Sequence, residues 1–278
     1  MATQEAPAPA PSAGPLAGRS AVVTGGATLV GAGVVRALHA AGATVTVLDI
    51  DGDGAKALTA ELDQVRPDSA EALVVDITDD DALAGAISHV VESRGGIDVW
   101  VNLACTYLDD GADTSRADWL TALDVNLVSA VQAVRLARPH LAASGHGAVV
   151  NLTSISSSVA QTGRWVYPAS KAAIAQVTRS MAMDLAADRI RVNSVSPGWT
   201  WSKIMDTLSG GDRAKTDAVA APFHLLGRVG DPAEVGAVVA FLASDAASVV
   251  TGADWAADGG YSAMGPEQAV PAIPLLSA

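Results

Sequence analysis

Short runs of β-branched and aliphatic residues alternate with longer amphipathic stretches along most of this 278-residue chain. Parallel strands and the helices that cross over between them give this alternation. The predicted strands are 21–23, 44–48, 72–75, 99–101, 148–152, 191–196 and 254–257. The predicted helices are 30–41, 55–62, 80–91, 116–142, 169–186 and 233–242. The pattern predicts an α/β fold, namely a Rossmann-type doubly wound parallel sheet in three α/β/α layers that forms a single domain.

Both ends of the chain fall outside this alternation. Residues 1–17 are rich in Ala and Pro and show no helical or strand period, so we expect a disordered leader there. The domain is expected over 18–263, followed by a C-terminal tail at 264–278. Inside the domain, 198–226 break the alternation with Trp, Gly-Gly and Pro. That break predicts a mobile substrate-loop region rather than another strand–helix unit.

Charge and cysteine content limit the partners of the chain. The formal net charge of −13 argues against nucleic acid and anionic lipid, which demand clustered Lys and Arg. No uninterrupted apolar run approaches the roughly 20 residues that span a bilayer, so no membrane association is expected. A lone cysteine and the absence of a secretory signal pattern predict a reducing, cytoplasmic setting. The histidines lack metal-ligand spacing, so we expect no catalytic metal and a small-molecule partner.

A glycine-rich turn, Thr24-Gly25-Gly26-Ala27-Thr28-Leu29-Val30-Gly31, runs from the first predicted strand straight into a helix. Such a turn presents backbone N–H groups and a helix N-terminus to a pyrophosphate. The same turn can also serve only to let a strand and a helix pack closely. Asp49 favours the binding interpretation, because it closes the second strand 24 residues after Gly25. A carboxylate there accepts hydrogen bonds from ribose hydroxyls and repels a 2′-phosphate, which favours NAD over NADP unless Asp49 is only a solvated strand end.

Tyr167 and Lys171 stand four residues apart on a predicted helix, so their side chains lie on one face and can meet. Removing a proton from an alcohol at neutral pH needs a base with a pKa well below the value near 10 of free tyrosine, and a nearby ammonium favours the tyrosinate. Ser154 follows a buried strand 13 residues upstream of the tyrosine and can donate a hydrogen bond to a substrate oxygen. The three residues together predict proton-transfer chemistry on an alcohol or ketone.

The chain from about residue 18 to 263 resembles the short-chain dehydrogenase/reductase family of the single-domain kind. The matching positions are spread along its length: Thr24-Gly25 with Gly31, Asp76, Asn102-x-Ala104, Asn126, Ser154, Tyr167-x-x-x-Lys171, Asn193, Pro197-Gly198 and Asp258-Gly259-Gly260. The resemblance implies that Tyr167 is the acid/base and that Lys171 lowers its pKa and binds the nicotinamide ribose. It also implies that Ser154 orients the substrate and that Asn126 supports a proton relay. It implies an oxidoreductase that transfers a hydride between NAD(H) and a secondary alcohol or ketone.

The same resemblance assigns cofactor contacts around the sheet edge. The implied cofactor-binding residues are Gly25, Thr28, Leu29, Val30, Asp49, Asp76, Ile77, Asn102, Ala104, Tyr167, Lys171, Pro197, Gly198, Thr200 and Ser202. The family pattern has a glycine at the position of Leu29 and a second glycine at the position of Cys105. Because both positions face the expected cofactor site, we expect modest cofactor affinity.

Three indoles near the predicted catalytic residues suggest an apolar substrate. The predicted substrate-pocket residues are Ser156, Trp165, Trp199 and Trp201. Their positions favour a hydrophobic or cyclic secondary alcohol, although one or more of the indoles can equally be core or interface residues. The helices at 116–142 and 169–186 carry more apolar surface than one sheet face needs, and the family resemblance implies that they pair subunits in a homotetramer.

Two other functions stay open. One is a regulatory protein that keeps the fold and only senses the dinucleotide, with Leu29 and Cys105 as signs of that change. The other is a redox-neutral dehydratase or epimerase of related fold, which shares the tyrosine and the lysine.

Overall fold

The computed structural model describes residues 14–265, 274 and 276, and its centre is a seven-stranded sheet. The strand order is β3-β2-β1-β4-β5-β6-β7, and every neighbouring pair is parallel. All seven predicted strands are present, with ends that differ by at most two residues. The strands are β1 (Ser20–Thr24), β2 (Thr44–Asp49), β3 (Ala70–Val74), β4 (Val99–Asn102), β5 (Ala148–Leu152), β6 (Arg191–Pro197) and β7 (Asp254–Ala257).

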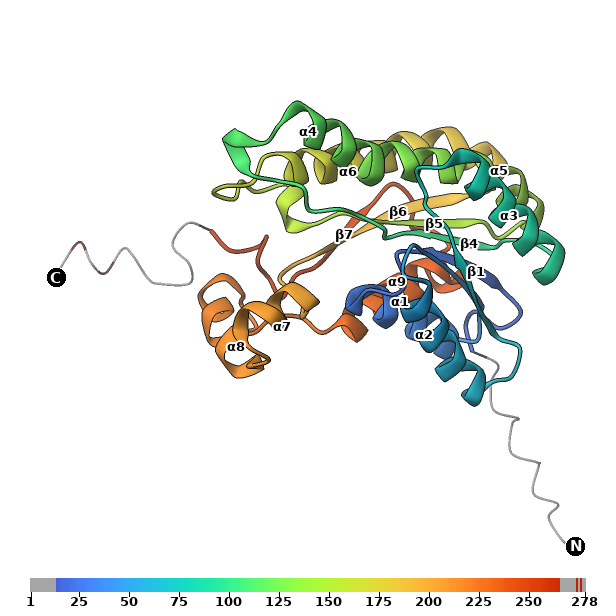
Figure 1. The fold of residues 1–278 in the computed structure, drawn as a ribbon, viewed down its shortest axis with the longest axis horizontal. Helices are drawn as coiled ribbons and strands as arrows, with labels where there is room; N and C mark the ends of the chain where they lie inside the picture. The colour runs from blue at the N-terminus through green and yellow to red at the C-terminus, as the bar shows by residue number, and fades with distance from the viewer. Residues whose placement is uncertain (1–13, 266–273, 275, 277–278) are drawn as a thin grey trace, which may run out of the picture.

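Helices cover both faces of the sheet and give the predicted three layers (Figure 1). Helices α1, α2 and α9 lie on one face, and α3, α4, α5 and α6 lie on the other (Figure 1). The α-helices are α1 (Leu29–Ala40), α2 (Gly52–Val65), α3 (Asp80–Arg94), α4 (Arg116–Leu123), α5 (Ser129–Ser144), α6 (Val166–Leu185), α7 (Lys203–Ser209), α8 (Arg213–Ala220) and α9 (Pro232–Ala243). Shorter helical turns are η1 (Gly111–Asp113), η2 (Asp124–Val128), η3 (Ile155–Ser157), η4 (Ala186–Asp188), η5 (Ala221–Phe223) and η6 (Asp245–Ala247).

The sheet separates two apolar cores, one on each face. Strands β1, β4 and β5 are buried along their whole length, because helices cover both of their faces. Val35, Leu38 and Val239 pack on one face, whereas Ile87 and Val134 pack on the other. This burial explains why these strands read as continuous aliphatic runs rather than as alternating apolar and polar residues.

One predicted boundary was wrong, and one region predicted as a loop contains helices. Leu16, which we placed in a disordered leader, is only 1% exposed and belongs to the core, and its N–H donates to the Ala41 carbonyl over 2.8 Å. The ordered domain therefore begins by Gly14, while residues 1–13 lie outside the described residues. The region 198–226, predicted as a substrate-loop region and not another strand–helix unit, holds no strand of the sheet but contains the helices α7 and α8. Ser202 caps the start of α7, and Asp212 caps the start of α8. Both helices are short and polar, so the sequence showed no clear helical pattern there.

The predicted helix at 116–142 is three helical segments in a row, α4, η2 and α5, with η2 a π-helical turn. The stretch Arg116–Ser144 is long and apolar enough to cross a membrane by length and composition alone. One of its faces packs on the core, however, because Ala133, Ala137 and Leu141 are buried against the sheet side. Length and composition are thus weak support for a membrane span here.

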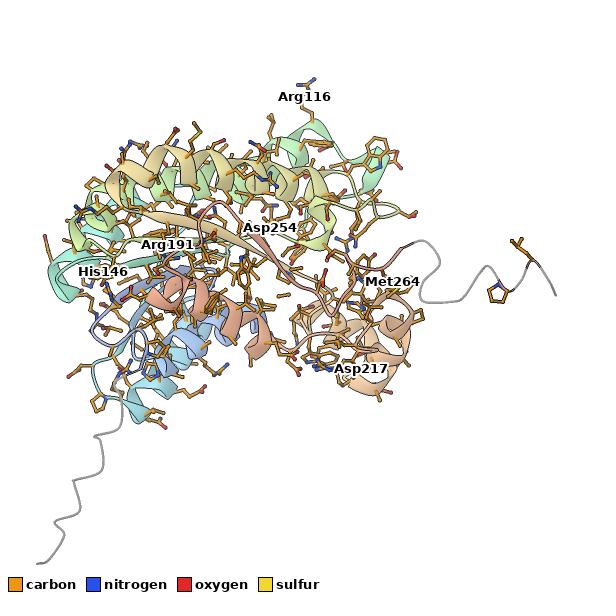
Figure 2. The ribbon with its side chains drawn as sticks, turned by 180° about the vertical axis from the view of Figure 1, so that it is seen from behind. Arg116, His146, Arg191, Asp217, Asp254 and Met264 are labelled. Carbon is orange, nitrogen blue, oxygen red and sulfur yellow. The ribbon has the colours of Figure 1, made fainter. Side chains whose placement is uncertain are left out.

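Polar side chains tie the β5, β6 and β7 side of the sheet together. Asp254, at the start of β7, accepts hydrogen bonds from the hydroxyls of Thr153 and Ser194, both over 2.7 Å (Figure 2). Arg191, at the start of β6, donates to the carbonyls of Leu242 and Ser244 over 2.7 and 3.1 Å (Figure 2). These bonds attach the last strand to β5 and β6, and they attach the end of α9 to β6.

Helices α1 and α9 approach so closely that only glycine fits between them. A Cβ added at Gly33 would lie 2.5 Å from the Pro232 carbonyl carbon, and one at Gly236 would lie 2.4 Å from the Gly33 oxygen. The first turn of α9 therefore rests directly on α1.

The Gly33→Ala variant is expected to lose about 1–3 kcal/mol of unfolding free energy, because the added methyl overpacks the contact between α1 and α9. Gly85→Ala is the matched control, since Gly85 is also in a helix but has nothing within 4 Å of its added Cβ. That variant is expected to gain up to about 1 kcal/mol from helix propensity. Urea unfolding of both variants measures the difference, and equal midpoints would contradict the close packing.

Candidate active site

The glycine-rich turn between β1 and α1 touches the segment that follows β4. Gly25 has φ of +73°, and a Cβ on it would lie 2.6 Å from Ala104 Cα. Thr28 caps α1 by accepting a hydrogen bond from the Gly31 N–H over 3.0 Å. Helix geometry leaves the N–H groups of Leu29 and Val30 without intrahelical partners, so they can meet an anion. The residues present therefore fit a pyrophosphate.

Leu29, the departure from the family pattern, opens α1 with its side chain 42% exposed. Its backbone has ordinary helical geometry, so the leucine does not break the turn. Glycine is required instead at Gly25 and at Gly31, whose Cβ would lie 2.2 Å from the Gly25 oxygen.

Asp49 ends β2 beside this turn, as its position in the sequence predicts. Its two carboxylate oxygens accept hydrogen bonds from the N–H groups of Ala27 and Asp51, over 2.8 and 2.9 Å. Each carboxylate oxygen can accept a second bond, so ribose hydroxyls can still be held there. The sequence pattern did not reveal that Asp49 also fixes the glycine-rich turn.

The residues predicted to surround the adenine and the ribose lie at the ends of β3 and β4. Asp76 accepts hydrogen bonds from the backbone and the hydroxyl of Thr78, and these bonds hold the pKa of its carboxyl below the usual range. Ile77 is buried. The Asn102 side chain points into the core, where it donates to Asn151 Oδ1 over 2.9 Å, so only its backbone is available for a cofactor.

Helix α6 brings Tyr167 and Lys171 together, as the four-residue spacing predicts. Lys171 is 3% exposed, and its Nζ lies 5.7 Å from the centroid of the Tyr167 ring. The same Nζ donates to the Leu152 carbonyl at the end of β5 over 2.8 Å. The ammonium is thus held against the tyrosine by the strand that leads to Ser154.

Ser154 and Ser156 belong to the turn η3, which packs against α6. Ser154 Oγ accepts a hydrogen bond from the Ser156 N–H over 3.2 Å, and the Ser156 hydroxyl donates to Gln161 over 2.8 Å. Both serines are nearly buried. The serine and the tyrosine are therefore parts of one packed unit.

Asn126 lies in the π-helical turn η2 and is 3% exposed. Its amide accepts from the Thr106 N–H over 2.7 Å and donates to the Thr106 carbonyl and to Ser170 Oγ, over 3.0 and 3.1 Å. Ser170 in turn donates to the Tyr167 carbonyl over 2.8 Å. The π turn, a feature frequent at functional sites, directs Asn126 toward the first turn of α6.

Two residues that the sequence analysis missed also contact Tyr167. The ring of Tyr107 stacks on the Tyr167 ring with centroids 4.8 Å apart and an interplanar angle of 25°. The Asp109 carboxylate accepts a hydrogen bond from the Tyr167 N–H over 2.8 Å. Both follow β4, about 60 residues before the tyrosine, so no local pattern indicates the contact.

The segment after β6 carries the remaining predicted cofactor residues. Gly198 follows Pro197, and a Cβ on it would lie 2.8 Å from Asp258 Cα, which explains the glycine. Thr200 is buried and donates to the Gly198 carbonyl over 3.3 Å, while Ser202 caps α7. The chain there runs from the sheet edge directly into α7 and α8, which together are called the inserted helices below.

The three predicted pocket indoles separate into two groups. Trp199 packs on Phe223 with centroids 5.8 Å apart, and Trp201 lies over the Arg213 guanidinium at 5.4 Å. Trp199 thus contacts the turn η5, which follows α8, and Trp201 contacts α8 itself. Trp165 precedes α6 on the tyrosine side and is 55% exposed, so the structure does not gather all three around one core.

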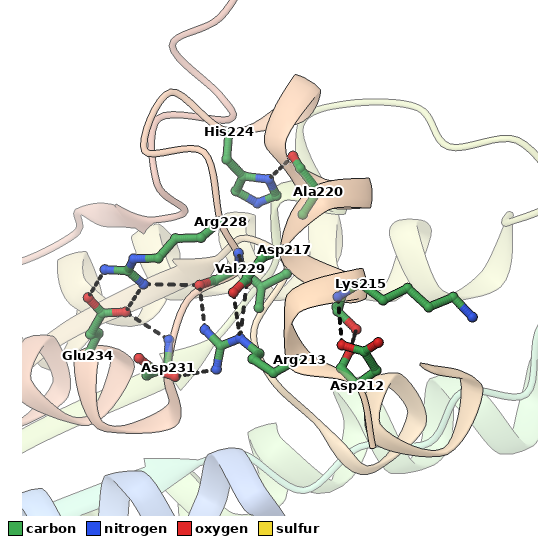
Figure 3. Close-up of polar contacts among 11 residues, drawn as sticks. Asp212, Arg213, Lys215, Asp217, Ala220, His224, Arg228, Val229, Asp231 and Glu234 are labelled. Atoms are coloured by element: carbon green, nitrogen blue, oxygen red, sulfur yellow. Dashed lines mark hydrogen bonds and ion pairs between the residues drawn. The ribbon is translucent and has the colours of Figure 1, made fainter. Parts of the chain in front are cut away.

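Ion pairs fasten the insertion to the start of α9 (Figure 3). Arg213 pairs with Asp217 and Asp231 over 3.1 and 2.6 Å. Arg228 pairs with Glu234 over 2.7 Å, and this hydrogen bond lowers the pKa of Glu234 to about 2. Among the described residues, no group of three or more His, Cys, Asp and Glu side chains could hold a metal ion.

Comparisons with known proteins agree with this geometry. A family model described as enoyl-(acyl carrier protein) reductase matches residues 25–262. The cis-4-hydroxycyclohexanecarboxylate dehydrogenase of Sinomonas cyclohexanicum is 38% identical over 251 residues, which cover 88% of this chain and 97% of that protein. The 3-alpha-(or 20-beta)-hydroxysteroid dehydrogenase of Mycobacterium bovis is 35% identical over 249 residues, which cover 89% of this chain and 90% of that protein.

A solved structure also matches. The short-chain type dehydrogenase/reductase from Mycobacterium marinum superposes with a TM-score of 0.81 at 31% identity, covering 90% of this chain and 97% of its own. The fold and these relatives define an oxidoreductase of a class that uses nicotinamide cofactors. The chain belongs to the short-chain dehydrogenase/reductase family, which confirms the resemblance seen in the sequence.

The Gly25→Ala variant is expected to weaken dinucleotide binding about tenfold or more, because its Cβ would push the turn away from Ala104. Gly95→Ala is the control, since Gly95 has a similar φ of +81° but nothing within 4 Å of its added Cβ. An alanine at this φ is expected to lower the free energy of unfolding by about 1–2 kcal/mol and to leave the affinity for the dinucleotide unchanged. Titration calorimetry with NAD gives both constants, and unchanged binding by Gly25→Ala would rule out this turn as the cradle.

Proposed function

We propose that the chain is an NAD-dependent dehydrogenase of a hydrophobic or cyclic secondary alcohol, in which Tyr167 exchanges the proton of the reacting oxygen. One observation carries the proposal: Lys171 is buried with its ammonium 5.7 Å from the ring of Tyr167. A positive charge at that place can stabilise the negative charge that develops on the tyrosine oxygen during proton transfer, as acid/base catalysis on an alcohol needs. The names of the two relatives above, a dehydrogenase of a hydroxycyclohexanecarboxylate and one of hydroxysteroids, support the substrate class.

The residues of the site divide the work. Tyr167 takes the hydroxyl proton in oxidation and returns it in reduction, and Lys171 stabilises the charge that this leaves. Ser154 donates a hydrogen bond to the substrate oxygen and orients it. Asn126 supports the proton path through its bonds to Thr106 and Ser170. When bound, the nicotinamide supplies the hydride chemistry, while the protein supplies alignment and charge.

The cofactor would be held along the carboxyl ends of the strands. Gly25, Thr28, Leu29 and Val30 take the pyrophosphate, Asp49 the adenosine ribose, and Asp76 and Ile77 flank the adenine. The backbone at Asn102 and Ala104, with Lys171, takes the nicotinamide ribose. The segment with Pro197, Gly198, Thr200 and Ser202 takes the carboxamide side, and Ser156, Trp165, Trp199 and Trp201 are the pocket candidates.

We also propose a cytoplasmic homotetramer. Large apolar side chains remain exposed on the helices on the tyrosine side of the sheet, including Leu120 at 61%, Val128 at 44% and Met183 at 83%. A contact with another copy of the chain would cover them.

The deciding experiment follows absorbance of reduced nicotinamide with a panel of cyclic and acyclic secondary alcohols. Tyr167→Phe is expected to lower turnover by about 100-fold to 10,000-fold, because it removes the acid/base, while NAD binding stays intact. Tyr261→Phe, which removes a hydroxyl outside the proposed machinery, is the control.

Other results identify the two competing functions. Tight NAD binding without turnover of any alcohol or ketone would point to a cofactor-sensing protein. Conversion of a substrate without net change in the nicotinamide would point to a dehydratase or an epimerase.

Cofactor preference rests on Asp49. The Asp49→Asn variant is expected to lower the ratio of kcat/KM for NAD to that for NADP by about fivefold, because one carboxylate charge near a 2′-phosphate is worth roughly 1 kcal/mol. Asp51→Asn, a neutralisation two residues away at the N-cap of α2, is the control. Steady-state kinetics with both cofactors measures the ratio, and a ratio shifted equally by both variants would speak against a direct role.

A further inference from the structure

Helix α6, which carries Tyr167 and Lys171, begins without a cap of its own. Its N-cap residue is Trp165, which makes no side-chain hydrogen bond to the helix. The first N–H groups of any helix lack intrahelical partners and need acceptors from elsewhere. The position of the first turn of α6, and of Tyr167 within it, therefore depends on what supplies those acceptors.

Asp109 supplies them from a distant part of the chain. One carboxylate oxygen accepts from the Trp165 N–H over 2.9 Å and from the Gly111 N–H over 3.1 Å. The other accepts from the Tyr167 N–H over 2.8 Å. A carboxylate here also meets the positive end of the α6 dipole. The side chain thus acts as the cap that the helix lacks.

The charge of Asp109 is maintained in this setting. Burial opposes ionisation of the carboxyl, but the hydrogen bonds from Trp165, Tyr167, Gly111 and Val166 outweigh it and hold its pKa below the ordinary value. Charge-assisted hydrogen bonds of this kind are roughly twice as strong as neutral ones.

The segment that carries Asp109 contacts the same tyrosine at a second place. Asn126 holds Thr106 through both its N–H and its carbonyl, and Asp109 holds the other end of the segment on α6. Between these anchors, the Tyr107 ring stacks on the Tyr167 ring. Burial of its hydroxyl end, with Cys105 and Tyr167 beside it, raises the pKa of Tyr107, although the ring as a whole is half exposed. The backbone and the ring of Tyr167 are therefore both held by residues 106–109.

We propose that Asp109 is a positioning residue for Tyr167, fixing the first turn of α6 so that the tyrosine hydroxyl stands where the substrate oxygen must arrive. Asp109 acts through the backbone, because its carboxylate oxygens accept from the N–H groups of Trp165, Tyr167 and Gly111. The inference rests on the proposed role of Tyr167 as acid/base. Displacement of a reacting group by about 1 Å can cost about 100-fold in rate.

The test compares Asp109→Asn with Asp110→Asn. Asparagine keeps the shape and one acceptor of Asp109 but loses the charge and presents an NH₂ group to a backbone N–H. Asp110 is the matched control, because it is the next residue, is exposed, and its side chain caps nothing. Circular dichroism and a thermal melt establish that both variants are folded.

For Asp109→Asn we expect kcat to fall about tenfold to 100-fold with NAD affinity within about twofold of the wild type. We also expect the solvent isotope effect on kcat, measured in D₂O, to increase, because the misplaced transfer of the hydroxyl proton becomes limiting. A purely structural cap would lower the active fraction and leave the isotope effect unchanged. Asp110→Asn should match the wild type in every readout.

Hydrogen exchange reports the geometry without turnover. The amides of residues 165–167 should exchange faster in Asp109→Asn than in Asp110→Asn. A folded Asp109→Asn variant with unchanged kcat, isotope effect or exchange would overturn the proposed role of Asp109 and leave the proposed function standing. A wild-type protein that turns over no alcohol or ketone would instead overturn the proposed function, and with it this role.

Discussion

Strand β1 pairs in parallel with β2 on one side and β4 on the other, and this double pairing decides where the functional side chains can lie. Parallel strands bring their carboxyl ends to one edge of the sheet, and ligands bind in the crevice where the strand order reverses. At that point the glycine-rich turn leaves β1 and the segment with Ala104 leaves β4. The two backbones touch, as the 2.6 Å clash of an added Cβ on Gly25 shows. Thr24 secures the contact, because its hydroxyl accepts from the N–H of Leu103 over 3.1 Å.

Sequence could predict what periodicity and spacing encode. The strands, the sheet class, the placement of Asp49 at a strand end and the meeting of Tyr167 with Lys171 all follow from repeats of two, of 3.6 or of four residues. Each of these features is local, or is imposed by the rule that parallel strands share an edge. The family resemblance added Asn126, whose contact with the tyrosine region crosses 44 residues to Ser170.

What sequence could not predict are contacts between segments that no period relates. Asp109 lies in an irregular segment and belongs to no sequence motif, and its bond to the Tyr167 N–H spans 58 residues. Leu16 lies in an Ala- and Pro-rich stretch and is buried only because α1 ends beside it, where the Ala41 carbonyl accepts its N–H. Helices α7 and α8 are only 7 and 8 residues long, which is too short for a helical period to stand out in the sequence.

The inserted helices and helix α1 both contact the first turn of α9. Arg213 of α8 pairs with Asp231, the N-cap residue of α9, and also lies under the Trp201 ring. The next residue, Pro232, packs on Gly33 in the helix that begins at the glycine-rich turn. The first turn of α9 is therefore fixed from two sides, by ion pairs from the insertion and by backbone contact with α1. Because the contact between α9 and α1 leaves no room for a methyl group, the first turn of α9 cannot move closer to the helix that follows the glycine-rich turn.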